Sequence, residues 1–220
     1  MAKVSIRFLS VGEYFKLTAL LTTCSVFALI LLRVQTFVPV ELLTRDPAEI
    51  ANHSSIYGIV SNVGAQLWTA TAAICFMGVG LLHILQTSRE KKLFLLVFGC
   101  FSTILGLDDL FMLHERLIPN KLGIAEEFVL VVYVVAFFLS CFRFRKQILR
   151  TQSLLFLLSV GLFTLSVGFD TIIPTGSLSK TDVYWIEDGA KFLGILLWLL
   201  YFTQEFFRSV LLSINSLIKR

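Results

Sequence analysis

Six long apolar runs, separated by short polar breaks, constrain this chain more than any other feature of its sequence. A helix needs about 20 mostly apolar residues to cross the ~30 Å hydrocarbon core of a bilayer. Lipid offers no partner for open backbone hydrogen bonds, so runs of this length predict helices rather than strands. The expected fold is all-α, a six-helix transmembrane bundle. Its helices cover roughly residues 16–34, 57–86, 92–114, 124–143, 153–173 and 184–208.

Composition agrees with a chain whose solvent is mostly lipid. Hydrophobic residues make up 56% of the chain and charged residues only 15%, whereas soluble domains carry about 25% charged residues. No linker or repeat divides the sequence, so a single integral membrane domain over residues 1–220 is expected. The first run lacks a small-residue cleavage site and is interpreted as a retained helix. Four cysteines inside apolar runs, with no CxxC pair, are interpreted as small buried hydrophobes: Cys24, Cys75, Cys100 and Cys141.

The distribution of lysine and arginine predicts the orientation. With the N-terminus in the cytoplasm, five basic residues fall outside and Lys191 lies within the sixth helix. Thirteen fall inside, namely Lys3, Arg7, Lys16, Arg89, Lys91, Lys92, Arg143, Arg145, Lys146, Arg150, Arg208, Lys219 and Arg220. Both termini are therefore expected to be cytoplasmic, in a multi-pass protein of the cell membrane, the bacterial inner membrane. The basic excess orients the chain and attracts anionic lipid, so the bilayer is the expected partner and no nucleic acid is needed.

Most acidic residues fall on the opposite side in this topology. Twelve of the 15 lie in outer loops or outer parts of helices: Glu41, Asp46, Glu49, Asp108, Asp109, Glu115, Glu126, Glu127, Asp170, Asp182, Glu187 and Asp188. An ionised group in the hydrocarbon region costs at least ~2.5–3.5 kcal/mol. The acids inside helices are therefore expected to face a watered hollow of the bundle, near its outer face.

Helical spacing supports this convergence, because residues at i, i+4, i+7 and i+11 share a face. The third helix carries Gly99, Ser102, Gly106 and Asp109 on one stripe, and the second carries Asn62, Gln66, Thr69 and Ala73. The candidates for binding or proton relay are Asp108, Asp109, His114, Glu115, Glu126, Asp170, Glu187, Asp188, Lys191, Asn62 and Gln66. A structural reading stays open for each, since small and polar stripes also pack helices together.

Local pairs give two further expectations. Lys191 lies at i+4 from Glu187 and at i+3 from Asp188, so a local ion pair is available. Asp108, His114 and Glu115 are weak candidates for a metal site of oxygen and nitrogen ligands, without an HExxH or ExxH spacing. The sequence specifies no cofactor. The first outer loop, roughly Gln35 to Ile56, is interpreted as a lid, a short interfacial helix or a simple connection.

Three stretches resemble a group of small, mostly uncharacterised bacterial membrane proteins. They are LDDLFMLHERLIPNKLGIAEE (107–127), WIEDGAKFLGILLW (185–198) and SNVGAQLWTATAAICF (61–76). The resemblance implies a membrane location and no activity. A fainter one, carried by Ser61-Asn62, Leu107-Asp108-Asp109 and Asp170, is to the alkaline-ceramidase and adiponectin-receptor superfamily of intramembrane zinc hydrolases. This chain lacks the HxxxH pair of that superfamily and has six expected spans instead of seven.

Three functions remain as hypotheses. The preferred one is transport or binding of a cation, proton or small amine-bearing solute at the outward-facing acidic site, because intramembrane carboxylates commonly relay protons. The second is an intramembrane hydrolase that acts on lipid through Asp108, Asp109 and His114. The third is a non-catalytic assembly or sensory subunit. A second copy of the chain stays open as a partner.

Overall fold

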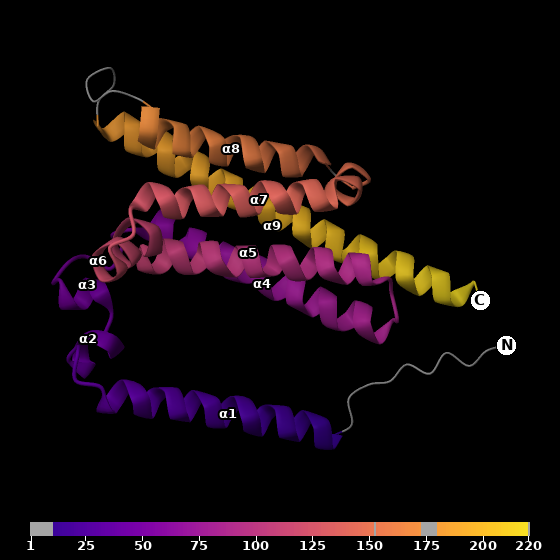
Figure 1. The fold of residues 1–220 in the computed structure, drawn as a ribbon, viewed down its shortest axis with the longest axis horizontal. Coiled ribbons are helices and arrows are strands. Elements are labelled where there is room, and N and C mark those ends of the chain that lie inside the picture. The colour runs from indigo at the N-terminus through magenta and orange to yellow at the C-terminus, as the bar shows by residue number, and fades with distance from the viewer. Residues whose placement is uncertain (1–10, 152, 173–179, 220) are drawn as a thin grey trace. The chain divides into compact units, whose positions relative to one another are not determined.

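The computed structural model consists of helices, turns and loops over the residues that it describes, which are 11–151, 153–172 and 180–219. Within them it does not describe the side chains of 11–15, 17, 21, 41, 169–172 and 180. The expected all-α class is confirmed for this part of the chain. The helices are α1 (Val11–Val34), α2 (Val40–Thr44), α3 (Pro47–Ile50), α4 (Ile59–Ile84), α5 (Arg89–Phe111), η1 (Leu113–Leu117), α6 (Ile118–Leu122), α7 (Glu126–Leu149), α8 (Ser153–Ile172) and α9 (Lys180–Ile218) (Figure 1).

Four of these helices are long and apolar enough to cross a membrane, which indicates a membrane protein. They are Ile59–Ile84, Arg89–Phe111, Glu126–Leu149 and Thr181–Ile218. Helices α1 and α8 contain shorter apolar segments, Thr18–Val34 and Ser153–Gly168. The six predicted runs each contain a long helix, but six crossings and the side of each terminus stay predictions.

The chain divides into two compact units near Ile59. The N-terminal unit holds α1, α2 and α3. Here the Gln35 side chain accepts hydrogen bonds from the backbone N–H groups of Phe37 and Val38 just after α1. Asp46 caps α3 by accepting from the N–H of Ala48. The predicted first loop thus contains two short helices, and the expectation of one domain over residues 1–220 stays a prediction.

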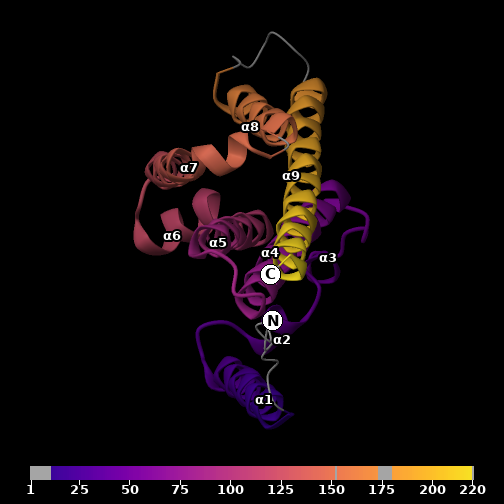
Figure 2. The same cartoon turned by 90° about the vertical axis from the view of Figure 1, so that its right-hand side faces the viewer.

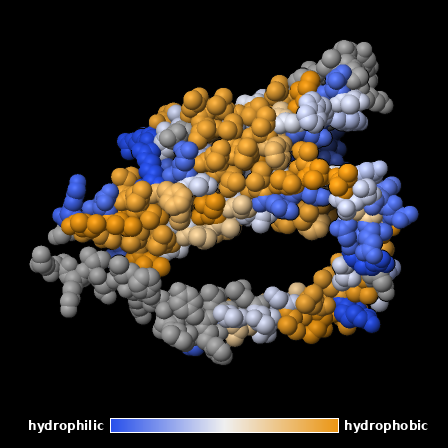
Figure 3. Space-filling model, turned by 180° about the vertical axis from the view of Figure 1, so that it is seen from behind, coloured by the Kyte–Doolittle hydropathy of each residue, from blue (hydrophilic) through white to orange (hydrophobic). Residues whose placement is uncertain are grey.

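The second unit, from Val60 onward, is a bundle of five long helices (Figures 1 and 2). Helix α5 lies between α4 and α7, and α8 packs along α9. Its surface carries many apolar side chains, such as Phe138, Leu139 and Phe142 of α7, and hydrophilic residues gather toward helix ends (Figure 3). A large apolar surface of this kind suits contact with lipid tails.

Glycines allow the helices of this bundle to approach closely. A Cβ on Gly106 of α5 would lie 2.9 Å from Trp68 Cβ of α4. On α9, a Cβ on Gly194 would lie 2.7 Å from the Phe163 ring of α8. The hydroxyl of Ser159 donates to the Gly194 carbonyl at 2.8 Å, which ties α8 to α9 directly. Small residues thus set the helix spacing, as expected where helices pack within lipid.

Aromatic rings fill the centre of the bundle. Phe98 of α5 lies 5.7 Å from Trp198 and 5.3 Å from Phe202 of α9, centroid to centroid. Phe156 of α8 lies 5.5 Å from Trp198. The indole N–H of Trp198 donates to the Ser102 hydroxyl at 3.0 Å, so its buried polar atom is satisfied. This packed, apolar middle separates polar groups at the two ends of the bundle.

Three predicted C-terminal helix ends were wrong. The fourth helix was expected to stop at residue 143, but α7 continues to Leu149. The sixth helix was expected to stop at residue 208, but α9 continues to Ile218. It continues because no proline or glycine follows Gly194, and because Ser209 and Ser213 are buried rather than solvated. The third helix was expected to reach residue 114, but α5 ends at Phe111. The cause is a turn at Met112.

Candidate functional site

A sharp turn after α5 positions the first group of the site. Met112 adopts the left-handed conformation, with φ 49° and ψ 52°, and its N–H bonds to the Asp108 carbonyl. The next residues form the π-helical turn η1, in which the N–H of Leu117 bonds to the carbonyl of Met112 at 3.0 Å. A positive φ is uncommon for a residue with a side chain. The turn folds His114 back onto the last turn of α5.

Asp108 is nearly buried and uses both carboxylate oxygens. Its Oδ2 lies 2.5 Å from Nδ1 of His114. Its Oδ1 accepts the backbone N–H of His114 at 2.9 Å and the hydroxyl of Tyr133, on α7, at 3.3 Å. The carboxylate therefore links α5, η1 and α7, and it orients the His114 ring so that Nε2 points away from it. This Nε2 lies 3.8 Å from Oε1 of exposed Glu115.

Asp109 forms a second pair with different helices. Its Oδ1 lies 2.6 Å from Nζ of Lys191 on α9, and its Oδ2 accepts the indole N–H of Trp68 on α4 at 2.9 Å. The Asp109 side chain is 7% exposed and that of Lys191 is 40% exposed. The carboxylate is thus held inside the bundle, whereas the lysine keeps partial contact with its surroundings.

The two neighbouring aspartates serve different helices because of helical geometry. Successive side chains on an α-helix point about 100° apart. Asp108 therefore faces α7 and η1, and Asp109 faces α4 and α9. Four segments thus meet around the last turn of α5. We call these two contacts, Asp108–His114 and Asp109–Lys191, the paired-aspartate site.

The charge of the site favours a protonated histidine. The hydrogen bond to Asp108 raises the pKa of His114 above its ordinary value of 6.5, partial burial opposes this, and the negative charges of Asp108, Glu115 and Glu126 add to the rise. His114 follows the end of the spanning helix α5 at Phe111. A protonated His114 and the Lys191 ammonium would together balance the charges of the two aspartates.

The remaining sequence candidates take different positions. Glu126 and Glu187 are half-buried in the first turns of α7 and α9, and Asp188 is exposed. Asn62 and Gln66 are exposed, so the polar stripe predicted for the second helix was assigned to the wrong face. The packed face of α4 instead includes Trp68, together with Ala65, Ala72 and Cys75. The Asp170 side chain lies outside the described residues.

Sequence reasoning missed two contacts of the site. The sequence offered Lys191 a local ion pair within its own helix, and the structure places its Nζ against Asp109 of α5. Trp68 was not selected at all, although its indole N–H needs an acceptor when buried. A usable signal was that Lys191 and Asp109 carry opposite charges and fall in parts of two helices that the sequence predicts to lie toward the same side of the membrane.

The geometry of the site does not resemble a metal centre. In the part of the chain that the structure describes, no group of three or more His, Cys, Asp and Glu side chains could hold a metal ion. The Asp108 oxygens already contact the backbone N–H and the ring of His114 and the hydroxyl of Tyr133. The Asp109 carboxylate is paired with Lys191. The weak metal candidates Asp108, His114 and Glu115 therefore meet as an ion-paired group.

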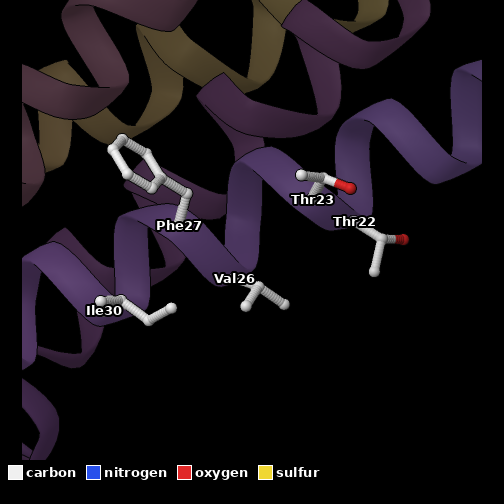
Figure 4. A pocket seen from close by; sticks show the side chains of 5 residues that line it. All are labelled: Thr22, Thr23, Val26, Phe27 and Ile30. Atoms are coloured by element: carbon white, nitrogen blue, oxygen red, sulfur yellow. The ribbon is translucent and has the colours of Figure 1, made fainter.

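A hollow on α1 offers no chemistry of its own. It is lined by Thr22, Thr23, Val26, Phe27 and Ile30, all from one helix (Figure 4). None of these side chains titrates near neutral pH, and all are exposed. The paired-aspartate site remains the stronger candidate.

Comparison with known proteins assigns the chain to a family. A protein-family model matches residues 17–204, a region that contains α4, α5 and α7 and both pairs of the site. The chain belongs to this family, which is described as "Domain of unknown function (DUF8692)". Neither a curated protein nor a solved structure matches it. The expected resemblance to an uncharacterised family is confirmed, and the function has to be argued from the site.

Proposed function

We propose that this chain is a multi-pass protein of the bacterial inner membrane, with six crossings and cytoplasmic termini, that binds and conducts a proton or small cation at the paired-aspartate site. The support for the crossings is the six apolar runs and the bias of lysine and arginine. The support for the activity is one observation, the pair between Asp109 and Lys191 from separate membrane-spanning helices.

This pair is suited to exchange. A carboxylate that is 7% exposed needs a positive partner in an apolar bundle, and here a lysine side chain supplies it. A proton on Asp109, or an incoming small cation or amine, would replace the ammonium as that partner. Lys191 is 40% exposed, so its ammonium can move toward water when it is displaced. Binding of a proton or cation at Asp109 is then coupled to release of the Lys191 ammonium.

The second pair adds a group that titrates near neutral pH. His114 is the side-chain type whose ordinary pKa lies in this range. Its contact with Asp108, and that of Asp109 with Lys191, involve consecutive residues of α5. A change of protonation at His114 therefore alters the charge immediately beside the proposed binding carboxylate.

A second candidate is a non-catalytic assembly or sensory subunit. The observation in its favour is that both aspartates are fully paired within the chain, so the site holds four segments against α5 without any ligand. The hydrolase alternative has less support. Among the described residues, no hydroxyl or thiol that would serve as a nucleophile is hydrogen-bonded to the His114 ring.

Flux through reconstituted protein tests the proposal. Purified chain in liposomes with an internal pH dye, and separately with a sodium or potassium dye, is exposed to an ion gradient. We expect flux above that of empty liposomes, at least a tenfold loss in Asp109→Asn, and no loss in Glu127→Gln, which removes an exposed acid of α7. Flux equal to empty liposomes for all ions would contradict transport and favour the assembly role.

A further inference from the structure

A third buried carboxylate, in addition to those of Asp108 and Asp109, lies on α9, far from the paired-aspartate site. Glu205 follows Lys191 by almost four helical turns, about 21 Å at ~1.5 Å per residue. It is only 4% exposed. The aromatic core around Trp198 and Phe202 lies between the two positions. Glu205 therefore forms a site of its own.

The two oxygens of Glu205 are in unequal surroundings. Oε1 accepts the side-chain amide of Gln147, on α7, at 3.2 Å and the hydroxyl of Ser209 at 3.0 Å. Oε2 is buried and has no hydrogen-bond partner among the described residues. The donors on Oε1 are both neutral. Oε1 thus accepts two hydrogen bonds, as the carbonyl oxygen of a protonated carboxyl group can. Oε2 has no donor to accept from among the described residues.

Among the residues that the structure describes, no positive side chain forms an ion pair with this carboxyl group. The ion pairs between described residues do not include Glu205. The guanidinium of Arg208, on the same helix, donates instead to the Arg150 carbonyl at 2.5 Å. Arg208 and Lys91 of α5 act on Glu205 only through space. An ionised carboxylate that is buried without a paired cation is costly, and such a group takes up a proton instead.

We propose that Glu205 is a proton-binding site, with the proton on Oε2 in the resting protein. Uptake forms an O–H bond at Oε2 and breaks an O–H bond of hydronium, which leaves neutral water. The ligand is a proton rather than a metal ion, because one free oxygen beside a neutral amide and a hydroxyl gives too few oxygen ligands for a cation. The inference goes beyond the proposed function and does not depend on the paired-aspartate site.

Polar side chains connect Glu205 to the end of the bundle that the sequence predicts to be cytoplasmic. Ser209 and Ser213 follow it at i+4 and i+8 on the same buried face of α9. Ser213 accepts the hydroxyl of Thr87, in the α4–α5 connection, at 2.9 Å. Gln147 also lines a surface hollow of about 530 Å³ at the end of α7. Polar side chains of α7 and α9 thus lie between the carboxyl group and one end of the bundle.

The other polar and charged groups near Glu205 lie on α5, α7 and α9. On α9, the Tyr201 hydroxyl, one turn before Glu205, pairs with the Thr151 hydroxyl at 2.9 Å. Gln147 of α7 is neutral, and Lys91 of α5 and Arg208 are the charges nearby. Burial therefore disfavours the charged form of Glu205, whereas the hydrogen bonds from Gln147 and Ser209 and the two cations favour it.

Infrared difference spectroscopy on the full-length protein in liposomes tests the inference. A protonated carboxyl group has a C=O band that a carboxylate lacks and that shifts in D₂O. We expect one such band at neutral pH, lost in Glu205→Gln and kept in Glu127→Gln. Absence of a band that depends on Glu205 would overturn the proposal. Flux is not measured here, so failure of the transport proposal would leave this result unchanged.

A second variant keeps the test valid if Glu205→Gln does not fold. Ser209→Ala removes a donor from Oε1 but retains the acid. Loss of a hydrogen bond to a carbonyl oxygen strengthens the C=O bond, so we expect the same band to move to higher frequency. A band that stays in place would mean that Oε1 of Glu205 is not its source, which contradicts the proposal.

Discussion

Removing the ammonium group of Lys191 tests whether the pair with Asp109 stabilises the bundle. In Lys191→Met, Asp109 would keep only the indole N–H of Trp68 as a donor. Loss of one partner of a fully buried pair costs about 3–5 kcal/mol. Lys191 is 40% exposed, so solvent already screens part of the interaction. We therefore expect a loss of about 2–3 kcal/mol in the free energy of unfolding.

The partner substitution completes a double-mutant cycle. Asp109→Asn leaves an amide that can still accept from Trp68, and it leaves a lysine that can reach water, so we expect a loss of about 1–2 kcal/mol. The double variant removes both charges and should cost only about 1 kcal/mol, because no charge is left unpaired. The coupling energy between the two positions is then about 2–4 kcal/mol.

Unfolding in mixed micelles with increasing sodium dodecyl sulfate, followed by helical circular dichroism, measures these values. Lys121→Met is the matched control, because Lys121 is exposed on α6 and is expected to change stability by less than about 0.5 kcal/mol. Effects of the two substitutions that add within about 0.5 kcal/mol would refute the reasoning, since independent sites add within that range.

Two other perturbations follow from the same region. Because the pKa of His114 is raised, its pair with Asp108 stabilises the folded protein fully below about pH 6.5, and this stabilisation is lost as the pH rises through the raised pKa. We expect His114→Gln to flatten the pH dependence of the unfolding midpoint in this window. An unchanged slope would argue against the pair. Gly106→Ala places a methyl group 2.9 Å from Trp68 Cβ, so we expect a loss of about 1–3 kcal/mol in the same unfolding assay; a stability equal to the parent's would mean that α4 and α5 are less tightly packed.

The helices themselves were predictable from the sequence. The requirement to satisfy backbone hydrogen bonds in lipid acts on each segment separately, so an apolar run reveals a helix without knowledge of its neighbours. Helices α4, α5 and α7 therefore lie close to their expected positions. The end of α9 was missed, because Ser209 and Ser213 are polar in sequence and become buried only against other helices.

The presence of acidic residues inside an apolar helix was also visible in the sequence, but their partners were not. Asp109 was selected because an acid inside an apolar helix is costly, which is a local argument. That Lys191 and Trp68 pair with it depends on the rotation and depth of α4 and α9. Spacing along the chain contains no such information, and it favoured a local partner for Lys191 instead.

The sequence by itself determined that the long helices suit a lipid environment, that the fold is helical, and which side chains are costly to expose to lipid. Each of these follows from the transfer free energy of single segments and side chains. The tertiary structure decided which charges meet. The left-handed turn at Met112 brings His114 to Asp108, and close packing at Gly106 brings Trp68 toward Asp109. These contacts join residues that only packing places together, since they depend on how whole helices fit against one another.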